Sequence, residues 1–176
     1  MPKIIENVRG MLLDEAKRQI EEQGYESVTV RSIAKGCSLG LGTFYNYFKS
    51  KDMLIASFLL EDWQNRIAKI NEMSREENEP MSVVKYVHYE LKEFIEAHRG
   101  IFTSPEAIRS FNNTVSGYHK ILRKQIAEPI RHVCEVSGYE NSDFLAEFVA
   151  EATLSWTVGK KSFEELSPIL NKLFIK

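Results

Sequence analysis

The sequence predicts an all-α fold. Apolar residues recur at three- and four-residue spacing through most of the 176 residues, helix-capping residue types precede several of these segments, and no convincing strand pattern occurs. We expect a three-helix head, residues 1–48, followed by a larger helical body, residues 49–176. Because so small a head has little core of its own, a fourth helix is expected to join it to the body.

The head is predicted to contain a helix-turn-helix. Its first helix is amphipathic and ends at Gly24, a residue type that commonly terminates helices. Thr29 can cap a second helix by accepting a hydrogen bond from a backbone N–H. The glycines and serine in the run 36–40 disfavour continuation of that helix, and a third helix begins at about Leu41.

The body is predicted to be helical nearly throughout. Ser50 is expected to cap a fourth helix, and the polar run 74–80 is the clearest loop. Pro168 is a candidate break in the last helix. Further helices are expected at about 82–98 (closed by Gly100), after Ser104-Pro105, at 117–137 with a kink at Pro129, from an Asp143 cap to Gly159, and after a capping box of Ser162 and Glu165.

A basic segment lies within the head. No acidic residue occurs from Ser27 to Lys51, where Arg31, Lys35, Lys49 and Lys51 give a charge of +4, although the whole chain carries −2. Local positive charge of this kind suits a surface that meets a phosphate backbone. The segment therefore favours DNA binding.

The third helix of the head has a surface that suits the DNA major groove. Phe44 and Phe48 lie one turn apart and are expected to face inward. The rest of the helix then presents hydroxyl and amide groups from Thr43, Tyr45, Asn46 and Tyr47.

The head resembles the DNA-binding signature of the tetracycline-repressor (TetR) family of bacterial transcription regulators. The resemblance is carried by TVR at 29–31, IAK at 33–35, GTFYNYF at 42–48 and SK at 50–51, with the family's ten-residue interval from Ile33 to Thr43. The chain departs at Ser38, where the family usually has glycine, and at Gly40, where it usually has a serine or threonine cap. Serine tolerates a left-handed backbone less well than glycine, so the turn is expected to differ slightly. Beyond about 50 residues, the resemblance rests on length and helix layout.

The resemblance implies roles for individual head residues. Lys51 matches a phosphate contact at the start of the fourth helix, the alternative being a solvated lysine. Tyr45 is expected to contact a phosphate, and Leu41 to touch a thymine methyl group or nothing. Arg31 is expected to reach a base edge or a phosphate. The full predicted DNA-binding set is Thr29, Arg31, Leu41, Gly42, Thr43, Tyr45, Asn46, Tyr47 and Lys51.

The resemblance also implies a body that binds a small molecule and dimerises through its last two long helices. Independently, the helix Asp143–Gly159 and the C-terminal segment carry more apolar surface than one small domain readily covers, which favours a homodimer over ordinary core packing. Aromatic residues with a few polar tips suit an organic effector, although such residues are more often core. The candidate ligand-binding residues are Phe94, His98, Phe102, Phe111, Tyr118, Leu122 and Trp156.

The sequence offers little support for an enzyme, a metal site or a cofactor. No glutamate precedes a histidine by three residues, as a helical di-metal carboxylate site requires, and no glycine-rich phosphate loop or nucleophile elbow occurs. Cys37 and Cys134 give neither a disulfide framework nor a metal-ligand spacing. Charged residues interrupt the N-terminus and the longest apolar run, 53–60, is too short to span a bilayer, so a cytoplasmic protein is predicted.

The combined prediction is a homodimeric DNA-binding repressor that binds a palindromic operator and is released by an unknown small-molecule effector. Effector binding in the body is expected to change the relative position of the two heads. Two alternatives leave the basic segment unused for DNA: a helical small-molecule carrier or enzyme, and an adaptor that docks another protein.

Overall fold

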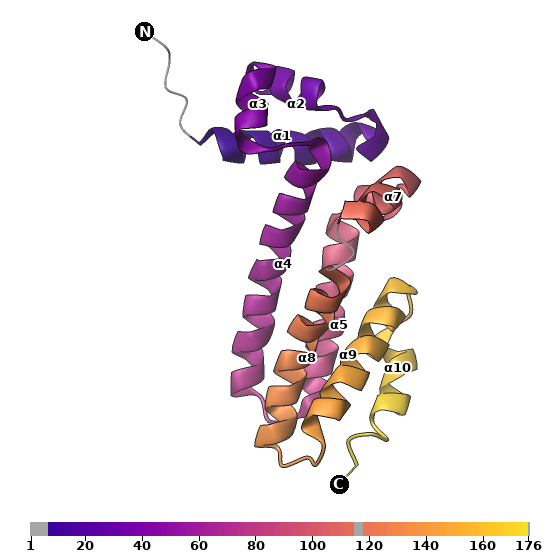
Figure 1. The fold of residues 1–176 in the computed structure, drawn as a ribbon. Helices are drawn as coiled ribbons and strands as arrows, with labels where there is room; N and C mark the ends of the chain where they lie inside the picture. The colour runs from indigo at the N-terminus through magenta and orange to yellow at the C-terminus, as the bar shows by residue number, and fades with distance from the viewer. Residues whose placement is uncertain (1–6, 115–117, 176) are drawn as a thin grey trace. The chain divides into compact units, whose positions relative to one another are not determined.

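The structure is a computed structural model that describes residues 7–114 and 118–175, with the side chains of 111–119 left out. Over these residues every regular element is helical, which confirms the predicted all-α class (Figure 1). The chain divides into two compact units. Unit 1 contains the described residues up to Glu61 together with His98–Thr114, and unit 2 contains Asp62–Ala97 and the described residues from Tyr118 onward. Within the described ranges, no helix is long and apolar enough to cross a membrane.

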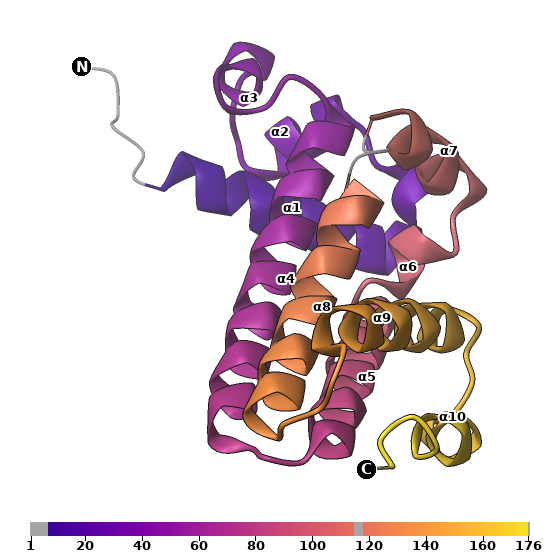
Figure 2. The same ribbon diagram turned by 60° about the horizontal axis from the view of Figure 1, so that its bottom comes forward.

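Unit 1 opens with three helices and a short 3₁₀ turn: α1 (Val8–Gln23), η1 (Tyr25–Ser27), α2 (Val30–Gly36) and α3 (Leu41–Tyr47). Asn7 caps α1 and Gly24 ends it at φ 80°. Thr29 caps α2 as predicted, since its Oγ1 accepts from the backbone N–H of Ser32 at 3.0 Å. The apolar faces of α1, α2 and α3 meet in one buried cluster. Figures 1 and 2 show the backbone of the three helices from two directions.

Three later helices add to unit 1: the first part of α4 (Lys51–Glu76), then α6 (Arg99–Phe102) and α7 (Pro105–Thr114). Phe58, Ile101 and Ala107 from these helices are buried in the same cluster as the head helices. Unit 1 is therefore larger than the expected 1–48 head. Compactness does not reveal function, so the division into a DNA-binding part and a ligand-binding part stays a prediction.

Two predicted helix caps in unit 1 are confirmed. The Ser50 hydroxyl accepts from the N–H of Met53 at 3.1 Å at the start of α4, and the Ser104 hydroxyl accepts from the N–H of Ala107 at 3.3 Å at the start of α7. The expected role of Gly100 is wrong, because Gly100 lies inside α6 rather than closing the preceding helix.

Unit 2 contains the rest of α4 together with α5 (Pro80–Ala97), α8 (Tyr118–Val136), α9 (Ser142–Val158) and α10 (Phe163–Leu170). Helices α5, α8 and α9 pack on one another, and α10 packs on α5 and α9. Their shared core is apolar, with Val84, Ile126 and Val149 fully buried. The Trp63 indole N–H of α4 donates to the Gln125 side chain of α8 at 2.9 Å.

Three boundaries in unit 2 differ from prediction. The predicted loop 74–80 shortens to 77–79, because α4 continues to Glu76 and Pro80 starts α5 at the position that proline suits best. The N-cap of α9 is Asn141, and Asp143 lies in the first turn. Pro168 does not break α10, which continues to Leu170. Helix α8 runs through Pro129 as predicted, and the kink expected there stays a prediction. The capping box of Ser162 and Glu165 is confirmed.

Candidate nucleic-acid interface

The turn between α2 and α3 forms a Schellman motif. The N–H of Leu39 donates to the carbonyl of Ala34 at 2.8 Å, and the N–H of Ser38 donates to the carbonyl of Lys35 at 2.9 Å. This motif needs a left-handed residue, and Ser38 adopts that conformation with φ 56°. Gly40 precedes α3 without a side-chain cap, at φ −73°. The two departures from the family signature therefore fall on the two residues that set the geometry of the turn.

Aromatic and thiol side chains fix α3 against the other helices. Phe44 and Phe48 are buried as predicted, with ring centroids 6.0 Å apart. Cys37, at the end of α2, is also buried, and its thiol donates to the carbonyl of Met11 at 3.3 Å. Burial raises the pKa of the Cys37 thiol, which favours the neutral form. These contacts orient the opposite side of α3 toward solvent.

The exposed side of α3 carries polar and aromatic side chains without charge. Leu41, Tyr45 and Tyr47 are 39%, 56% and 48% exposed. Gly42 and Asn46 are exposed as well, whereas Thr43 is half-buried. Tyr45 packs edge-on against Phe44, with centroids 5.6 Å apart, which leaves the ring partly covered and accessible from outside. Apart from half-buried Thr43, the residues of α3 predicted to bind DNA are thus exposed.

Basic residues surround this helix. Arg31 and Lys35 are exposed on α2, and Lys49 is exposed just after α3. Thr29 is also exposed, but its oxygen is occupied in capping α2. Because no carboxylate occurs between Ser27 and Lys51, nothing within the segment neutralises these cations. The segment keeps a local positive field that attracts a polyanion.

Lys51 differs from the other three cations because its ammonium group is bound within unit 1. Its Nζ donates to the carbonyl of Tyr25 at 3.1 Å and lies 3.9 Å from the centroid of the Tyr25 ring. The carboxylate of Glu106 on α7 is 3.6 Å away, and the Lys51 side chain is only 16% exposed. The predicted phosphate contact therefore requires Lys51 to exchange or share these partners.

A second polar contact ties α7 to the start of α4. Asp52 accepts hydrogen bonds from the phenol of Tyr25 and, at 2.5 Å, from the hydroxyl of Ser110. Burial and the neighbouring Asp52 carboxylate raise the pKa of Tyr25, so its phenol stays protonated. The sequence analysis missed Asp52, Glu106 and Ser110, because no local spacing connects residues so far apart in the chain.

A contact between α1 and α2 was also not predicted from the sequence. The Ser32 hydroxyl donates to the side-chain oxygen of Gln19 at 2.6 Å, and the Gln19 amide donates to the Ser32 carbonyl at 3.1 Å. Gln19 is buried on α1. The only sequence signal was Ser32 at the third position after the Thr29 cap, where its hydroxyl completes a capping box.

The structure divides the predicted ligand-binding residues between the two units. Phe94 and Leu122 pack on the core of unit 2, where Phe94 lies edge-on to Trp63 at 5.5 Å. Trp156 is also in unit 2, with its indole N–H donating to the Ser162 carbonyl at 3.1 Å. His98 and Phe102 belong to unit 1. The side chains of Phe111 and Tyr118 lie outside the described residues.

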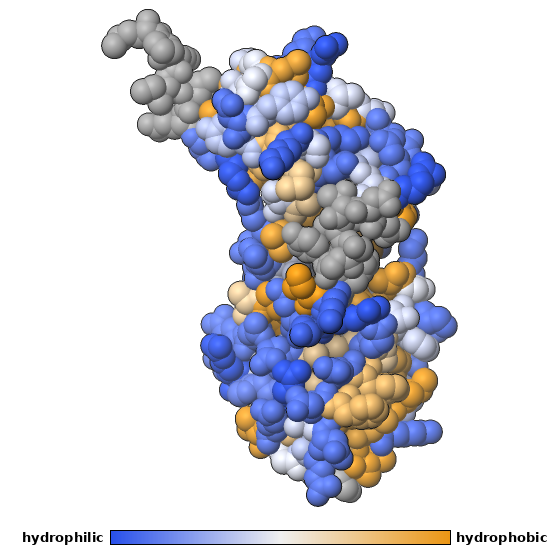
Figure 3. Space-filling view, in the orientation of Figure 1, coloured by the Kyte–Doolittle hydropathy of each residue, from blue (hydrophilic) through white to orange (hydrophobic). Residues whose placement is uncertain are grey.

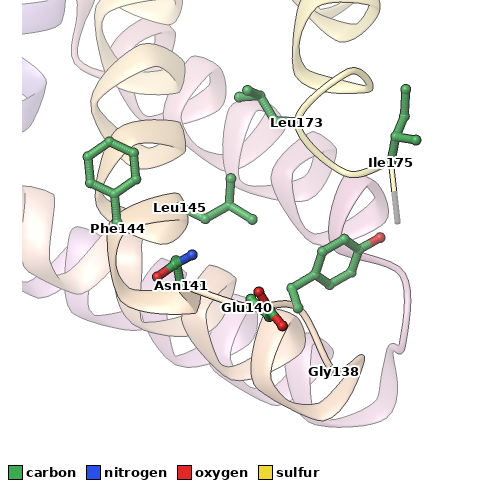
Figure 4. A pocket seen from close by; sticks show the side chains of 8 residues that line it. Gly138, Glu140, Asn141, Phe144, Leu145, Leu173 and Ile175 are labelled. Carbon is green, nitrogen blue, oxygen red and sulfur yellow. The ribbon is translucent and has the colours of Figure 1, made fainter.

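Unit 2 contains a surface pocket of about 520 Å³ that none of the candidates with described side chains lines. It lies where α8 leads into α9, beside the C-terminal residues (Figure 4). Phe144, Leu145, Leu173 and Ile175 contribute apolar side chains to it. The effector-binding residues consequently stay a prediction.

Exposed apolar side chains mark the outer face of α9. Phe144 and Phe148 are 73% and 51% exposed, and their rings stack with centroids 6.3 Å apart. Val158 and Ile169 are also exposed, whereas Val149 and Leu166 are buried in the core. Figure 3 shows apolar side chains gathered on the surface that α9 and α10 occupy in Figure 1. The apolar residues expected at an interface thus divide into core residues and a solvent-facing set.

Residues 12–58 match the family model described as "Bacterial regulatory proteins, tetR family". The chain is 25% identical over 144 residues to the HTH-type transcriptional regulator UidR of Escherichia coli, which covers 81% of this chain and 63% of UidR. The chain therefore spans less than two thirds of that relative's length. It is also 31% identical over 80 residues to the nucleoid occlusion factor SlmA of Haemophilus ducreyi, covering 46% of this chain and 40% of SlmA.

Solved structures show the same fold. FadR of Thermus thermophilus, a TetR-family transcriptional repressor in complex with lauroyl-CoA, has a TM-score of 0.64 at 16% identity and covers 96% of each chain. FadR of Bacillus subtilis, in complex with stearoyl-CoA, has a TM-score of 0.53 at 20% identity and covers 93% of this chain and 96% of that one. At these identities the likeness concerns the fold.

Proposed function

Because the chain belongs to the TetR family of bacterial regulatory proteins, we propose that it is a homodimeric transcriptional repressor that binds a palindromic DNA operator. Its role is regulatory rather than enzymatic, as in its relatives named as transcriptional regulators. The observation that carries the proposal is the uncharged, exposed surface of α3 beside the exposed cations Arg31, Lys35 and Lys49. A cytoplasmic location agrees with this role.

In this proposal the exposed basic residues and helix α3 have different roles in DNA binding. Arg31, Lys35 and Lys49 neutralise phosphates, which supplies affinity for any DNA. Helix α3 enters the major groove, and its hydroxyl, amide and apolar groups supply sequence preference. Lys51 adds a phosphate contact after its ammonium leaves or shares the carbonyl of Tyr25 and the carboxylate of Glu106.

Dimerisation is proposed to use the outer face of α9. Stacked aromatic rings as exposed as Phe144 and Phe148 are unfavourable in water, and a second copy of the same surface would cover both pairs about a twofold axis. A twofold dimer presents two α3 helices, so the proposed operator is palindromic.

The proposed effector is a small organic molecule bound by residues 49–176. Two proteins with this fold, the FadR structures, are complexes with acyl-CoA thioesters. Lauroyl-CoA and stearoyl-CoA are therefore the first compounds to test for release of the operator, together with CoA alone as the control for headgroup binding. The half-buried Phe94 and Leu122 are the first positions to substitute.

The decisive experiment is selection of bound genomic fragments followed by anisotropy titrations at several salt concentrations. Lys35→Ala should weaken binding to every fragment and reduce the slope of log K against log salt by about 1.8, because each of the two protomers loses one phosphate contact. Lys69→Ala, which removes another exposed lysine from α4 in unit 2, is the matched control and should leave both quantities unchanged.

Two results would reject the proposal in favour of its alternatives. Absence of salt-sensitive DNA binding, with tight binding of an organic ligand, would favour a carrier or enzyme. A stoichiometric protein partner bound without DNA would favour an adaptor.

A further inference from the structure

Helix α3 contains no charged residue, and this restricts which base pairs it can prefer. Its seven residues read LGTFYNY. The commonest specific contact to guanine is a bidentate one from arginine or lysine, and the amino group of cytosine is read by glutamate or aspartate. All four residue types are missing from α3. Its side chains must therefore act through neutral hydrogen bonds and apolar contact.

Asn46 is the residue best placed for a neutral hydrogen bond to a base. It follows Phe44 by two positions, which turns it roughly 200° around the helix from that buried anchor. Asn46 is exposed, and among the described residues no hydrogen-bond partner is found for its amide. Gly42 lies one turn earlier on the same side, and a Cβ built there meets nothing within 4 Å. A base edge can therefore approach this side of the helix closely, and an asparagine amide matches N6 and N7 of adenine.

Leu41 supplies the apolar contact. It is the first residue of α3 and is 39% exposed, whereas Leu39, two residues earlier, packs against the core of unit 1. Gly40 and Gly42 flank it, and a Cβ at either position would meet nothing within 4 Å. Leu41 is thus an exposed apolar side chain at the end of the helix that meets base edges in helix-turn-helix proteins. The apolar group that the major groove offers is the thymine methyl group.

From these observations we infer that α3 selects A·T base pairs in each operator half-site, with Asn46 hydrogen-bonding adenine and Leu41 packing on a thymine methyl group. This inference rests on the proposed function. It concerns only the bases that α3 reads, and it leaves Arg31 on α2 available for a flanking base or phosphate.

The test uses base analogues that remove one group at a time from the selected operator. Uracil in place of each half-site thymine removes only the methyl group, and one position should weaken wild-type binding by about fourfold, the equivalent of one buried methylene. The same change should have no effect on Leu41→Ala. 7-Deazaadenine removes the N7 acceptor, and at one position it should weaken wild-type binding by at least about fivefold while leaving Asn46→Ala unchanged.

Lys35→Ala is the matched control variant, because a phosphate contact is expected to weaken all analogue-containing operators equally. The inference is overturned if selected half-sites hold G·C pairs at every position protected by α3. It is also overturned if each analogue weakens the wild type and its paired variant by the same factor. Loss of all salt-sensitive binding in the wild type would instead reject the proposed function, so the two failures are distinguishable.

Discussion

The exposed faces of α3 in unit 1 and α9 in unit 2 differ in the partner that each can accept. Helix α3 presents neutral polar and aromatic groups beside the exposed cations Arg31 and Lys35. Helix α9 presents the stacked rings of Phe144 and Phe148. The first surface suits a hydrated polyanion and the second suits dry contact with another protein surface. The two proposed recognition surfaces therefore belong to separate units and can be disrupted separately.

The interiors of the two units differ as well. Unit 1 supports its short helices with partly buried polar contacts, between Gln19 and Ser32 and between Asp52 and its two hydroxyl partners. Unit 2 has a larger apolar core that also holds satisfied polar contacts: His88 Nδ1 lies 2.8 Å from the Thr157 hydroxyl, and Arg66 donates to the carboxylate of Glu90 at 2.8 Å. The buried Thr153 hydroxyl of the same core finds no partner among the described residues. The two interiors therefore differ at individual polar groups, since the contact between Gln19 and Ser32 is satisfied whereas the Thr153 hydroxyl is not.

The largest expected effect comes from breaking the α9 face. The double substitution Phe144→Glu and Phe148→Glu should raise the dimer Kd by at least about 100-fold, because each buried aromatic side chain contributes about 1.5–3 kcal/mol. Both side chains are exposed in the single chain, so its helix content should not change. Sedimentation equilibrium measures the dimer, and Glu147→Gln, an exposed change between them, is the control. A dimer that survives unchanged would move the interface elsewhere.

Substitutions at Lys51 and at Glu106 test whether their ion pair in unit 1 competes with DNA for the Lys51 ammonium group. Lys51→Ala should weaken binding to all DNA, since it removes one phosphate contact from each protomer of the proposed dimer, and lower the salt slope by about 1.8. Glu106→Gln should strengthen binding by up to about fivefold, because it removes a competing, largely exposed carboxylate 3.6 Å from the ammonium. Anisotropy titration measures both. If both variants weaken binding equally, the Lys51–Glu106 pair serves to hold α7 in place.

The difference between the two interiors can be tested at Gln19 and Thr153. Gln19→Met should lower the free energy of unfolding by about 1–3 kcal/mol, because it removes both hydrogen bonds between Gln19 and Ser32. Thr153→Val keeps the shape and removes an unpaired buried hydroxyl, so it should raise stability by up to about 1 kcal/mol. Urea denaturation followed by circular dichroism measures both changes. Equal effects of the same sign would show that the units do not differ in this respect.

The parts of the structure that local chemistry decides were predictable from the sequence. Thr29, Ser50, Ser104 and Ser162 each cap the helix that follows, because capping involves residues three positions apart. The inward side of α3 followed from the one-turn spacing of Phe44 and Phe48 in the same way.

Contacts between distant residues could not be predicted. Asp52 hydrogen-bonds Tyr25 and Ser110, which are 27 and 58 positions away in the sequence. No local sequence pattern predicts a contact between residues so far apart. The sequence predicts that Lys51 contacts phosphate, but it does not predict the ion pair with Glu106, because Glu106 lies on another helix. Helix α9 is apolar on several sides, so periodicity alone did not separate buried Val149 from exposed Phe148.

The smallest expected effect concerns the turn between α2 and α3. Ser38 has φ 56°, and this left-handed conformation costs an L-residue roughly 1–2 kcal/mol. Ser38→Gly removes that cost, but glycine also makes the unfolded chain more flexible, which lowers the free energy of unfolding by about 0.4–1 kcal/mol. We therefore expect a net increase of about 0.5–1 kcal/mol in the free energy of unfolding, measured by thermal denaturation. Gly40→Ser is the matched control, because it adds an N-cap at φ −73° in open space and should gain only about a few tenths of a kcal/mol. If Gly40→Ser gains more than Ser38→Gly, the missing cap of α3 limits the stability of this turn more than its left-handed residue does.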